Sequence, residues 1–189
     1  MRQVKERRDE ILEAAEQLVF RFGPRRMTME DVSEEIGISR PAVYQYFQNK
    51  NALLRAVAEN IHQKSLKRVS TELERTGDLS RCLSSALNAR DGYFFDEIKL
   101  TGKLPWYLDP KNENIQDILN SSQNVYKVML KRYLTRQRFP EAETETTVRL
   151  LMAVSAGLRL TLQDRDSFED VLQTSVAQIL SLAQQSVVA

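Results

Sequence analysis

The sequence is poor in the residues from which most catalytic and metal sites are built. Its 189 residues include one histidine, His62, and one cysteine, Cys82, and they contain no glycine-rich phosphate loop. A single cysteine cannot form a disulfide within the chain, and carboxylates alone are too common to indicate catalysis. We therefore expect no enzymatic activity, no cofactor and no metal site; turnover of a bound small molecule would overturn this expectation.

Glycine and proline are also scarce, with six and five residues, and aromatic residues make up 7%. Few helix-breaking residues favour an all-α fold, and a hydrophobic content of 42% suffices for a sizeable core. The chain has no uninterrupted apolar run of about 18 residues and no charged-then-apolar leader, which predicts a cytoplasmic protein without a membrane partner. The net charge of +1 gives no sign of a nucleic-acid partner. Evidence for such a partner has to come from how the charged residues are distributed along the chain.

Two short amphipathic helices around a glycine are predicted between residues 27 and 50. Thr28, with Asp31 three residues later, fits a capping box at the start of the first helix, and Gly37 ends it. Ser39 is expected to cap the second helix. The arrangement is typical of a helix-turn-helix, although similar helix pairs also occur in domains that never bind DNA.

The second of these helices is predicted to leave a polar and aromatic face exposed. Val43 and Phe47 are expected to point inward, and residues 36–58 contain no Asp or Glu, so the local field favours a polyanion. Arg40 is suited to guanine and Gln45 to adenine in the major groove. The predicted DNA-binding residues are Thr28, Ser39, Arg40, Pro41, Ala42, Tyr44, Gln45, Tyr46 and Lys50.

The other side chains of this face suit two kinds of contact. Pro41 and Ala42 are placed to pack against a thymine methyl group. Tyr44, Tyr46 and Lys50 are suited to contact phosphates. Tyr44 and Tyr46 lie on either side of a core position, so burial in the core would explain at most one of them.

Together with the helix that precedes it, this region contains a set of fixed elements: Ile11, Ala15, Phe22-Gly23, Thr28, Val32, Ile36-Gly37-Ile38-Ser39, Tyr44, Phe47, Lys50, Leu53 and Leu54. In this combination it resembles the DNA-binding domain of the tetracycline-repressor-like (TetR) transcriptional regulators, over roughly residues 7 to 57. The resemblance implies base contacts at Arg40 and Pro41, and backbone contacts at Thr28, Tyr44, Tyr46 and Lys50. Tyr46 stands where many members carry His and Pro41 where many carry Gly, so the operator preference can differ without a change of class.

The resemblance also implies an architecture and a function. It implies an N-terminal three-helix helix-turn-helix domain at residues 1–49, followed by a larger α-helical ligand-binding and dimerisation domain at residues 50–189. The expected protein is a homodimeric regulator, most often a repressor, that binds double-stranded DNA and leaves a pseudo-palindromic operator when a small-molecule effector binds. A long helix from Lys50 to about Glu74 is expected to connect the two parts.

An aromatic cluster flanks the predicted loop at residues 101–114, and one core helix is predicted before it, over residues 78–100. Burial in the core explains such a cluster as well as a pocket for an apolar or aromatic ligand does. The candidate ligand-binding residues are Tyr93, Phe94, Trp106, Tyr107, Tyr126, Met129 and Met152. Arg90, Asp91 and Lys103 are candidates for its polar groups, and their signs leave the charge of the ligand open.

The predicted helices at residues 144–163 and 167–187 both carry wide apolar stripes, and Ser167 with Asp170 fits a capping box at the start of the second. Two such stripes predict a homodimer through a four-helix interface. An architectural DNA-binding protein without a ligand is the alternative, and a solidly packed C-terminal domain would favour it.

Overall fold

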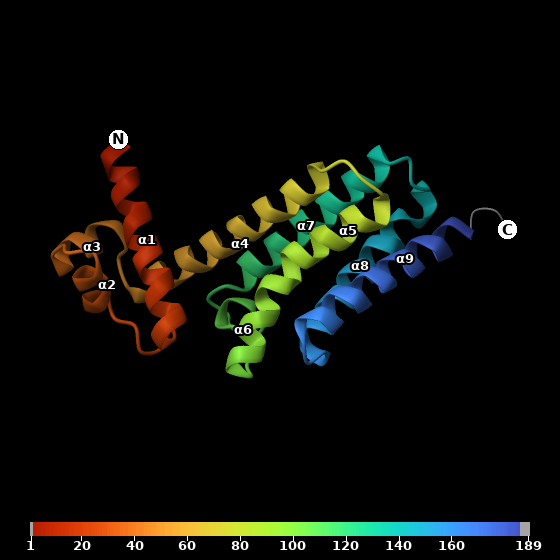
Figure 1. The fold of residues 1–189 in the computed structure, drawn as a ribbon. Helices are drawn as coiled ribbons and strands as arrows, with labels where there is room; N and C mark the ends of the chain where they lie inside the picture. Colours follow the sequence, from red (N-terminus) through yellow and green to blue (C-terminus); the bar gives the residue numbers. More distant parts are fainter. Residues whose placement is uncertain (1, 186–189) are drawn as a thin grey trace. The chain divides into compact units, whose positions relative to one another are not determined.

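The computed structural model describes the backbone of residues 2–185 and the side chains of residues 6–92, 94–100 and 102–185. Every regular element in this range is helical, which confirms the all-α prediction (Figure 1). The helices are α1 (Arg2–Phe22), α2 (Met29–Glu35), α3 (Arg40–Tyr46), α4 (Lys50–Glu74), α5 (Leu79–Leu87), α6 (Tyr93–Thr101), α7 (Gln116–Arg136), α8 (Glu141–Thr161) and α9 (Arg165–Gln185). A π-helical segment, Asn88–Gly92, lies between α5 and α6, and a 3-10 turn, Trp106–Leu108, follows α6.

The chain divides into two compact units. Unit 1 takes in the residues up to 63 together with 110–118, and unit 2 consists of 64–109 and the chain from 119 onward. Helix α4 runs through both units, so the predicted domain boundary at residues 49 and 50 stays a prediction.

Unit 1 is a three-helix arrangement on the first part of α4. Its apolar core consists of Ile11, Ala15, Leu18, Met27, Val32, Val43, Phe47, Leu53 and Val57. Gly37 lies between α2 and α3 with a φ of +67°, a left-handed conformation that a residue with a Cβ atom rarely adopts. This turn sets the direction in which α3 leaves α2.

The caps of unit 1 follow the predictions in part. Thr28 Oγ1 accepts from the Asp31 backbone N–H at 3.1 Å, and the Asp31 carboxylate accepts from the Thr28 N–H at 2.7 Å, so the predicted capping box is present. Ser39 occupies the N-cap position of α3, but its side chain makes no capping hydrogen bond. Pro41 in the first turn of α3 needs no partner for a backbone N–H.

Unit 2 contains a large apolar cluster to which α4, α5, α6, α7, α8 and α9 contribute. Phe95 of α6 and Phe168 of α9 meet in this cluster with ring centroids 5.1 Å apart. Figure 1 shows α8 and α9 side by side, joined by a short turn. Their packing buries Val148, Leu151, Leu172 and Val176.

Two predicted elements of unit 2 are wrong in detail. The helix expected over residues 78–100 is divided by the π-helical segment, in which the backbone hydrogen bonds span five residues instead of four. The final helix begins at Arg165 rather than Ser167, because Asp164 is the capping residue. Its carboxylate accepts from the backbone N–H and from the hydroxyl of Ser167, each at 2.8 Å.

Candidate nucleic-acid interface and effector site

Helix α3 presents most of the predicted DNA-binding residues on one side and its core residue on the other. Val43 is fully buried, whereas Ser39, Arg40, Pro41, Tyr44 and Gln45 are exposed. Ala42 and Tyr46 are half-buried. The first turn of a short exposed helix is the part that can contact base edges in a major groove.

The electrostatics around Arg40 are not as acid-free as the sequence indicated. Helix α2 brings Glu30 next to α3, and the Arg40 guanidinium lies 3.4 Å from its carboxylate. Arg40 also lies over the Tyr44 ring, 5.7 Å from the centroid. The pKa of Arg40 is raised, first by its side-chain interaction with Tyr44 and then by Glu30. Arg40 and Glu30 are both more than half exposed, so their pairing is weak and leaves Arg40 available for another acceptor.

The two predicted phosphate contacts outside α3 have partners within unit 1. Lys50 Nζ donates to the backbone carbonyl oxygen of Arg25 at 2.9 Å. The Thr28 hydroxyl accepts the capping bond of α2. Both side chains are therefore held in place within unit 1 by their intramolecular partners.

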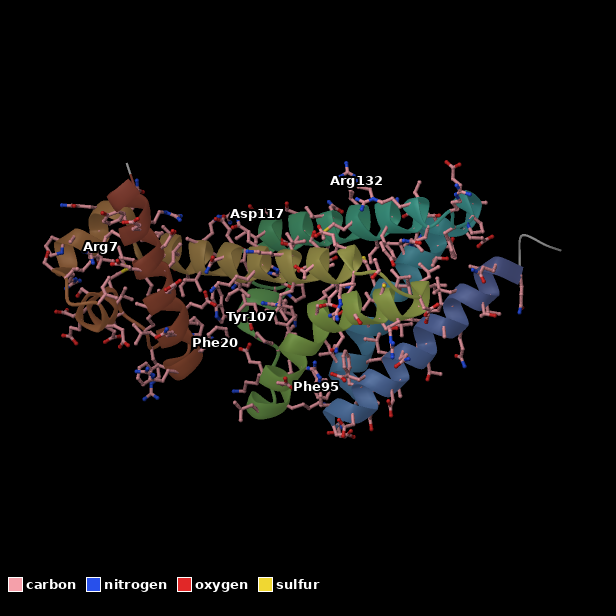
Figure 2. All side chains as sticks on the ribbon, turned by 45° about the horizontal axis from the view of Figure 1, so that its top comes forward. Arg7, Phe20, Phe95, Tyr107, Asp117 and Arg132 are labelled. Atoms are coloured by element: carbon pink, nitrogen blue, oxygen red, sulfur yellow. The ribbon has the colours of Figure 1, made fainter. Side chains whose placement is uncertain are left out.

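The sequence did not predict a group of polar contacts in unit 1, made by Arg55, Asn114 and Asp117 and called the latch below. Arg55 of α4 donates from Nη1 to Asp117 Oδ1 and to the Asn114 carbonyl oxygen, both at 2.8 Å, and its Nη2 makes a second bond to Asp117. Asn114 Nδ2 also donates to the carbonyl oxygen of Asn51 at 3.4 Å. Asp117 lies in the first turn of α7 (Figure 2). Arg55 lowers the pKa of the Asp117 carboxyl to about 2. Arg55 therefore holds the start of α7 against α4 and is not a spare cation for DNA.

The predicted ligand residues fall into three groups. Phe94, Trp106 and Tyr107 form the first, with centroid distances of 5.8 Å for Phe94–Tyr107 and 5.7 Å for Trp106–Tyr107. Tyr107 is fully buried, and its hydroxyl donates to the Glu97 carboxylate. Burial raises the pKa of Glu97, and the bond from Tyr107 partly offsets that rise. The side chain of Tyr93 lies outside the described residues.

The other two groups lie in the large cluster of unit 2 and at its surface. Tyr126 and Met152 are buried in the cluster. Met129 is partly buried against it and lines a separate surface pocket of about 160 Å³ with Tyr133 and Arg136. The six candidates whose side chains the structure describes are thus distributed over an aromatic group, the large cluster and the surface of that cluster.

A buried ionic network lies next to Tyr126, at the π-helical segment. Asp91 is fully buried and accepts a hydrogen bond from Ser155 Oγ and one of 2.5 Å from Arg159 Nη1. Arg90 Nη1 lies 3.5 Å from the same carboxylate, and the Arg90 guanidinium lies 5.2 Å from the centroid of the Tyr126 ring. The sequence analysis named Arg90 and Asp91 but gave no reason to add Ser155 or Arg159, which are more than 60 residues away.

The α8 and α9 helices leave apolar side chains exposed on the faces that are turned away from the cluster. Leu150 and Leu160 of α8 are 47% and 53% exposed, and Val171 and Leu182 of α9 are 39% and 66% exposed. Ala153 and Gly157, also exposed, lie between the two leucines. This pattern is typical of a face that another helical surface covers.

The described residues contain neither a metal-ligand cluster nor a membrane-spanning helix. Within them, no three or more His, Cys, Asp or Glu side chains gather closely enough to hold a metal ion. None of the described helices is long and apolar enough to cross a membrane.

Comparison with known sequences places the helix-turn-helix region in a family. Residues 11–57 match the family described as "Bacterial regulatory proteins, tetR family". The chain is 33% identical over 91 residues to the probable HTH-type transcriptional regulator ArpR of Pseudomonas putida. That match covers 46% of this chain and 43% of ArpR, so the chain spans less than half the length of this relative.

The fold of the whole chain also occurs in solved structures. A tetR-family transcriptional regulator from Streptomyces coelicolor superposes with a TM-score of 0.70 at 22% identity, over 96% of this chain and 83% of that one. The SmeT-triclosan complex superposes with a TM-score of 0.59 at 20% identity, over 95% of this chain and 90% of the other. At these identities the likeness shows the shared fold: a helix-turn-helix domain followed by a helical C-terminal domain.

Proposed function

Because residues 11–57 match the tetR family of bacterial regulatory proteins, we propose that the chain acts as a homodimeric repressor, released from a pseudo-palindromic operator by a small, largely apolar or aromatic effector. The observation that carries the proposal is the exposed face of α3. Arg40, Tyr44 and Gln45 point away from the core while Val43 anchors the helix, so the face is free to enter a major groove.

The exposed faces of α8 and α9 support the dimer. One α3 helix contacts only a few base pairs. In a two-fold symmetric dimer, the α3 helix of the second copy would lie about 34 Å from the first, in the major groove one turn of DNA further along. The apolar side chains of Leu150, Leu160, Val171 and Leu182 supply a surface that a second copy would bury.

The effector is assigned to unit 2. Two observations support a small apolar ligand there. Unit 2 contains aromatic and methionine residues in its large apolar cluster, and the structurally similar SmeT is solved in complex with triclosan. Release requires the ligand to bind more tightly to a state in which the α3 helices do not match the groove spacing.

The first test selects the DNA duplexes that the purified protein binds from a random library. The second measures the mass of the protein by light scattering. We expect a pseudo-palindromic site bound by a dimer. Arg40→Ala should cost about 1 to 3 kcal/mol and relax the base preference, whereas Lys50→Ala should weaken all sequences alike. An equal loss on all sequences for Arg40→Ala would contradict base reading, and a monomer that binds the palindrome tightly would contradict the dimer.

A further inference from the structure

The turn between α1 and α2, residues 23–27, carries two exposed arginines. Gly23 has a φ of +83°, and its backbone N–H makes a 2.8 Å hydrogen bond to the last turn of α1. The Met27 N–H then donates to the Gly23 carbonyl oxygen at 3.2 Å, and the Met27 side chain is fully buried. The turn is therefore closed at both ends, and Arg25 and Arg26 are exposed between them.

The turn is bonded to Lys50, one of the predicted phosphate contacts. Lys50 Nζ donates to the Arg25 carbonyl oxygen at 2.9 Å. A lysine ammonium group has three donors, so Lys50 keeps two of them for another acceptor. Thr28, which is also predicted to contact the DNA backbone, directly follows the turn. The two arginines therefore belong to the same part of unit 1 as two residues already expected to contact phosphates.

Neither arginine of the turn is neutralised by a carboxylate in the described part of the chain. The side chains of Arg25 and Arg26 make no ion pair and no hydrogen bond with the described residues. The first two acids that follow the turn have other partners. The Glu30 carboxylate lies 3.4 Å from Arg40, and the Asp31 carboxylate closes the capping box of α2. The positive charge of the turn is thus available to an anion outside the chain.

An ordinary role for cations that follow a helix is to interact with its last carbonyl groups. In α1 this role is filled in part by other groups, because the Gly23 N–H bonds to the last turn and Arg21 lies in that turn. If Arg25 and Arg26 acted only on α1, they would affect the stability of the protein and not its affinity for DNA. The two roles can therefore be separated by experiment.

We propose that Arg25, Arg26 and Lys50 form a clamp on the phosphate backbone of DNA, in which Lys50 also holds the turn in position. This inference rests on the proposed function, since it adds backbone contacts to the same DNA-binding unit. Cations that neutralise phosphates release condensed counterions, which strengthens binding to every sequence and makes it depend on salt. A planar guanidinium is well suited to this role because it makes two parallel hydrogen bonds to a phosphate. The clamp supplies affinity, whereas Arg40 supplies sequence preference.

The test measures how the affinity for DNA depends on salt. Binding of the full-length protein to a fluorescein-labelled duplex of arbitrary sequence is followed by anisotropy between about 50 mM and about 200 mM salt. The slope of log K against log[salt] falls by about 0.9 for each phosphate contact that is removed from B-DNA. Arg25→Gln/Arg26→Gln should therefore reduce the slope by about 1.8 for each bound protomer, and by the same amount on a duplex selected from the random library. An unchanged slope would overturn the proposal.

Two further variants separate phosphate binding from net charge. Arg25→Lys/Arg26→Lys keeps both charges and should keep the slope close to that of the wild type. Arg81→Gln/Arg132→Gln is the matched control, because it removes two equally exposed arginines from α5 and α7 of unit 2 (Figure 2 labels Arg132). Its slope should equal that of the wild type. The same fall in slope in both glutamine variants would show that only net charge matters and would overturn the proposal.

The positioning role of Lys50 is tested by combining substitutions. Lys50→Met removes one phosphate contact together with the bond that holds the turn, so the slope should fall by more than about 0.9 for each protomer. In the Arg25→Gln/Arg26→Gln background, only the contact of Lys50 itself remains to be lost, and the fall should be about 0.9. The same fall in both backgrounds would show that Lys50 does not position the turn and would overturn that part of the clamp.

Thermal unfolding of the same preparations reports on the structural alternative. Because both arginines of the turn are exposed, Arg25→Gln/Arg26→Gln should melt close to the wild type. A lower melting temperature with an unchanged slope would show that the arginines stabilise α1, and would overturn the clamp. A wild type that binds no duplex contradicts the proposed function itself. A wild type that binds duplexes with the same slope as Arg25→Gln/Arg26→Gln contradicts only the clamp.

Discussion

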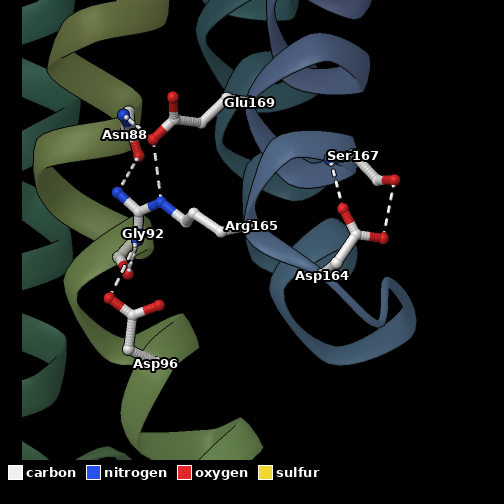
Figure 3. Close-up of polar contacts among 7 residues, drawn as sticks. All are labelled: Asn88, Gly92, Asp96, Asp164, Arg165, Ser167 and Glu169. Atoms are coloured by element: carbon white, nitrogen blue, oxygen red, sulfur yellow. Dashed lines mark hydrogen bonds and ion pairs between the residues drawn. The ribbon is translucent and has the colours of Figure 1, made fainter.

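The Arg165 guanidinium at the start of α9 donates to the backbone carbonyl oxygen of Gly92, the last residue of the π-helical segment (Figure 3). The same guanidinium donates to Asn88 Oδ1 at 2.9 Å, and its Nε donates to Glu169 at 2.8 Å. A Cβ atom on Gly92 would lie 2.1 Å from Asn88 Oδ1 and 2.7 Å from Arg165 Nη2. The absence of a side chain at Gly92 is therefore what lets α9 attach to the π-helical segment.

Gly92→Ala should destabilise the protein by about 1 to 3 kcal/mol, because the new methyl group displaces the guanidinium and leaves a carbonyl unsatisfied. Urea unfolding followed by circular dichroism measures the change. Gly77→Ala is the matched control: its Cβ meets only Cys82 Sγ, at 3.4 Å, and a much smaller effect is expected. Equal effects of the two variants would contradict the steric argument.

Glu30→Gln should strengthen operator binding about two- to fivefold, because Glu30 lies 3.4 Å from Arg40 and competes with DNA for it. Fluorescence anisotropy on a labelled duplex at fixed salt measures the affinity. Glu34→Gln on the same helix removes an equal charge from an exposed position and reports the general effect of charge on a polyanion. The same gain for both variants would mean that the Glu30–Arg40 contact has no specific role.

Leu150→Glu should convert the proposed dimer to a monomer and keep the helical content, because Leu150 is already 47% exposed in the single chain. A buried carboxylate without a partner opposes association by several kcal/mol. Val128→Glu on α7 is the control, since Val128 is 48% exposed but lies on a different helix. Light scattering at several concentrations reads out the mass. A dimer that persists in Leu150→Glu would place the interface elsewhere.

The parts of the fold that follow from local sequence were predicted well. The capping box of Thr28 and Asp31 depends on residues three apart, and the turn at Gly37 depends on one residue that tolerates a positive φ. Local rules did not choose between Asp164 and Ser167 as the cap of α9, since both residue types cap helices well. Here the Ser167 backbone N–H bonds to Asp164, which starts the helix earlier.

The polar contacts that shape the candidate sites join residues far apart in sequence and could not be predicted. Arg55 and Asp117 are separated by 62 positions, and Asp91 and Arg159 by 68. Each of these side chains alone is an ordinary charged residue in an amphipathic helix. Only the packing of the helices turns them into a latch on α4 or into a buried network.

Asp117→Asn should lower stability at neutral pH, and this loss should disappear in acid. The folded pKa of Asp117 is about 2, below the value of about 3.9 in an unfolded chain, so its pairing with Arg55 stabilises the fold above pH 4 and ceases to do so as the pH falls toward 2. The urea midpoints of wild type and variant should therefore differ at pH 7 and converge between pH 4 and pH 2. The carboxylate is exposed, so 1 M salt should also reduce the difference at pH 7. In an Arg55→Met background the same substitution should have no pH-dependent effect, and a constant gap between the two proteins from pH 7 to pH 2 would show that the latch does not depend on this charge.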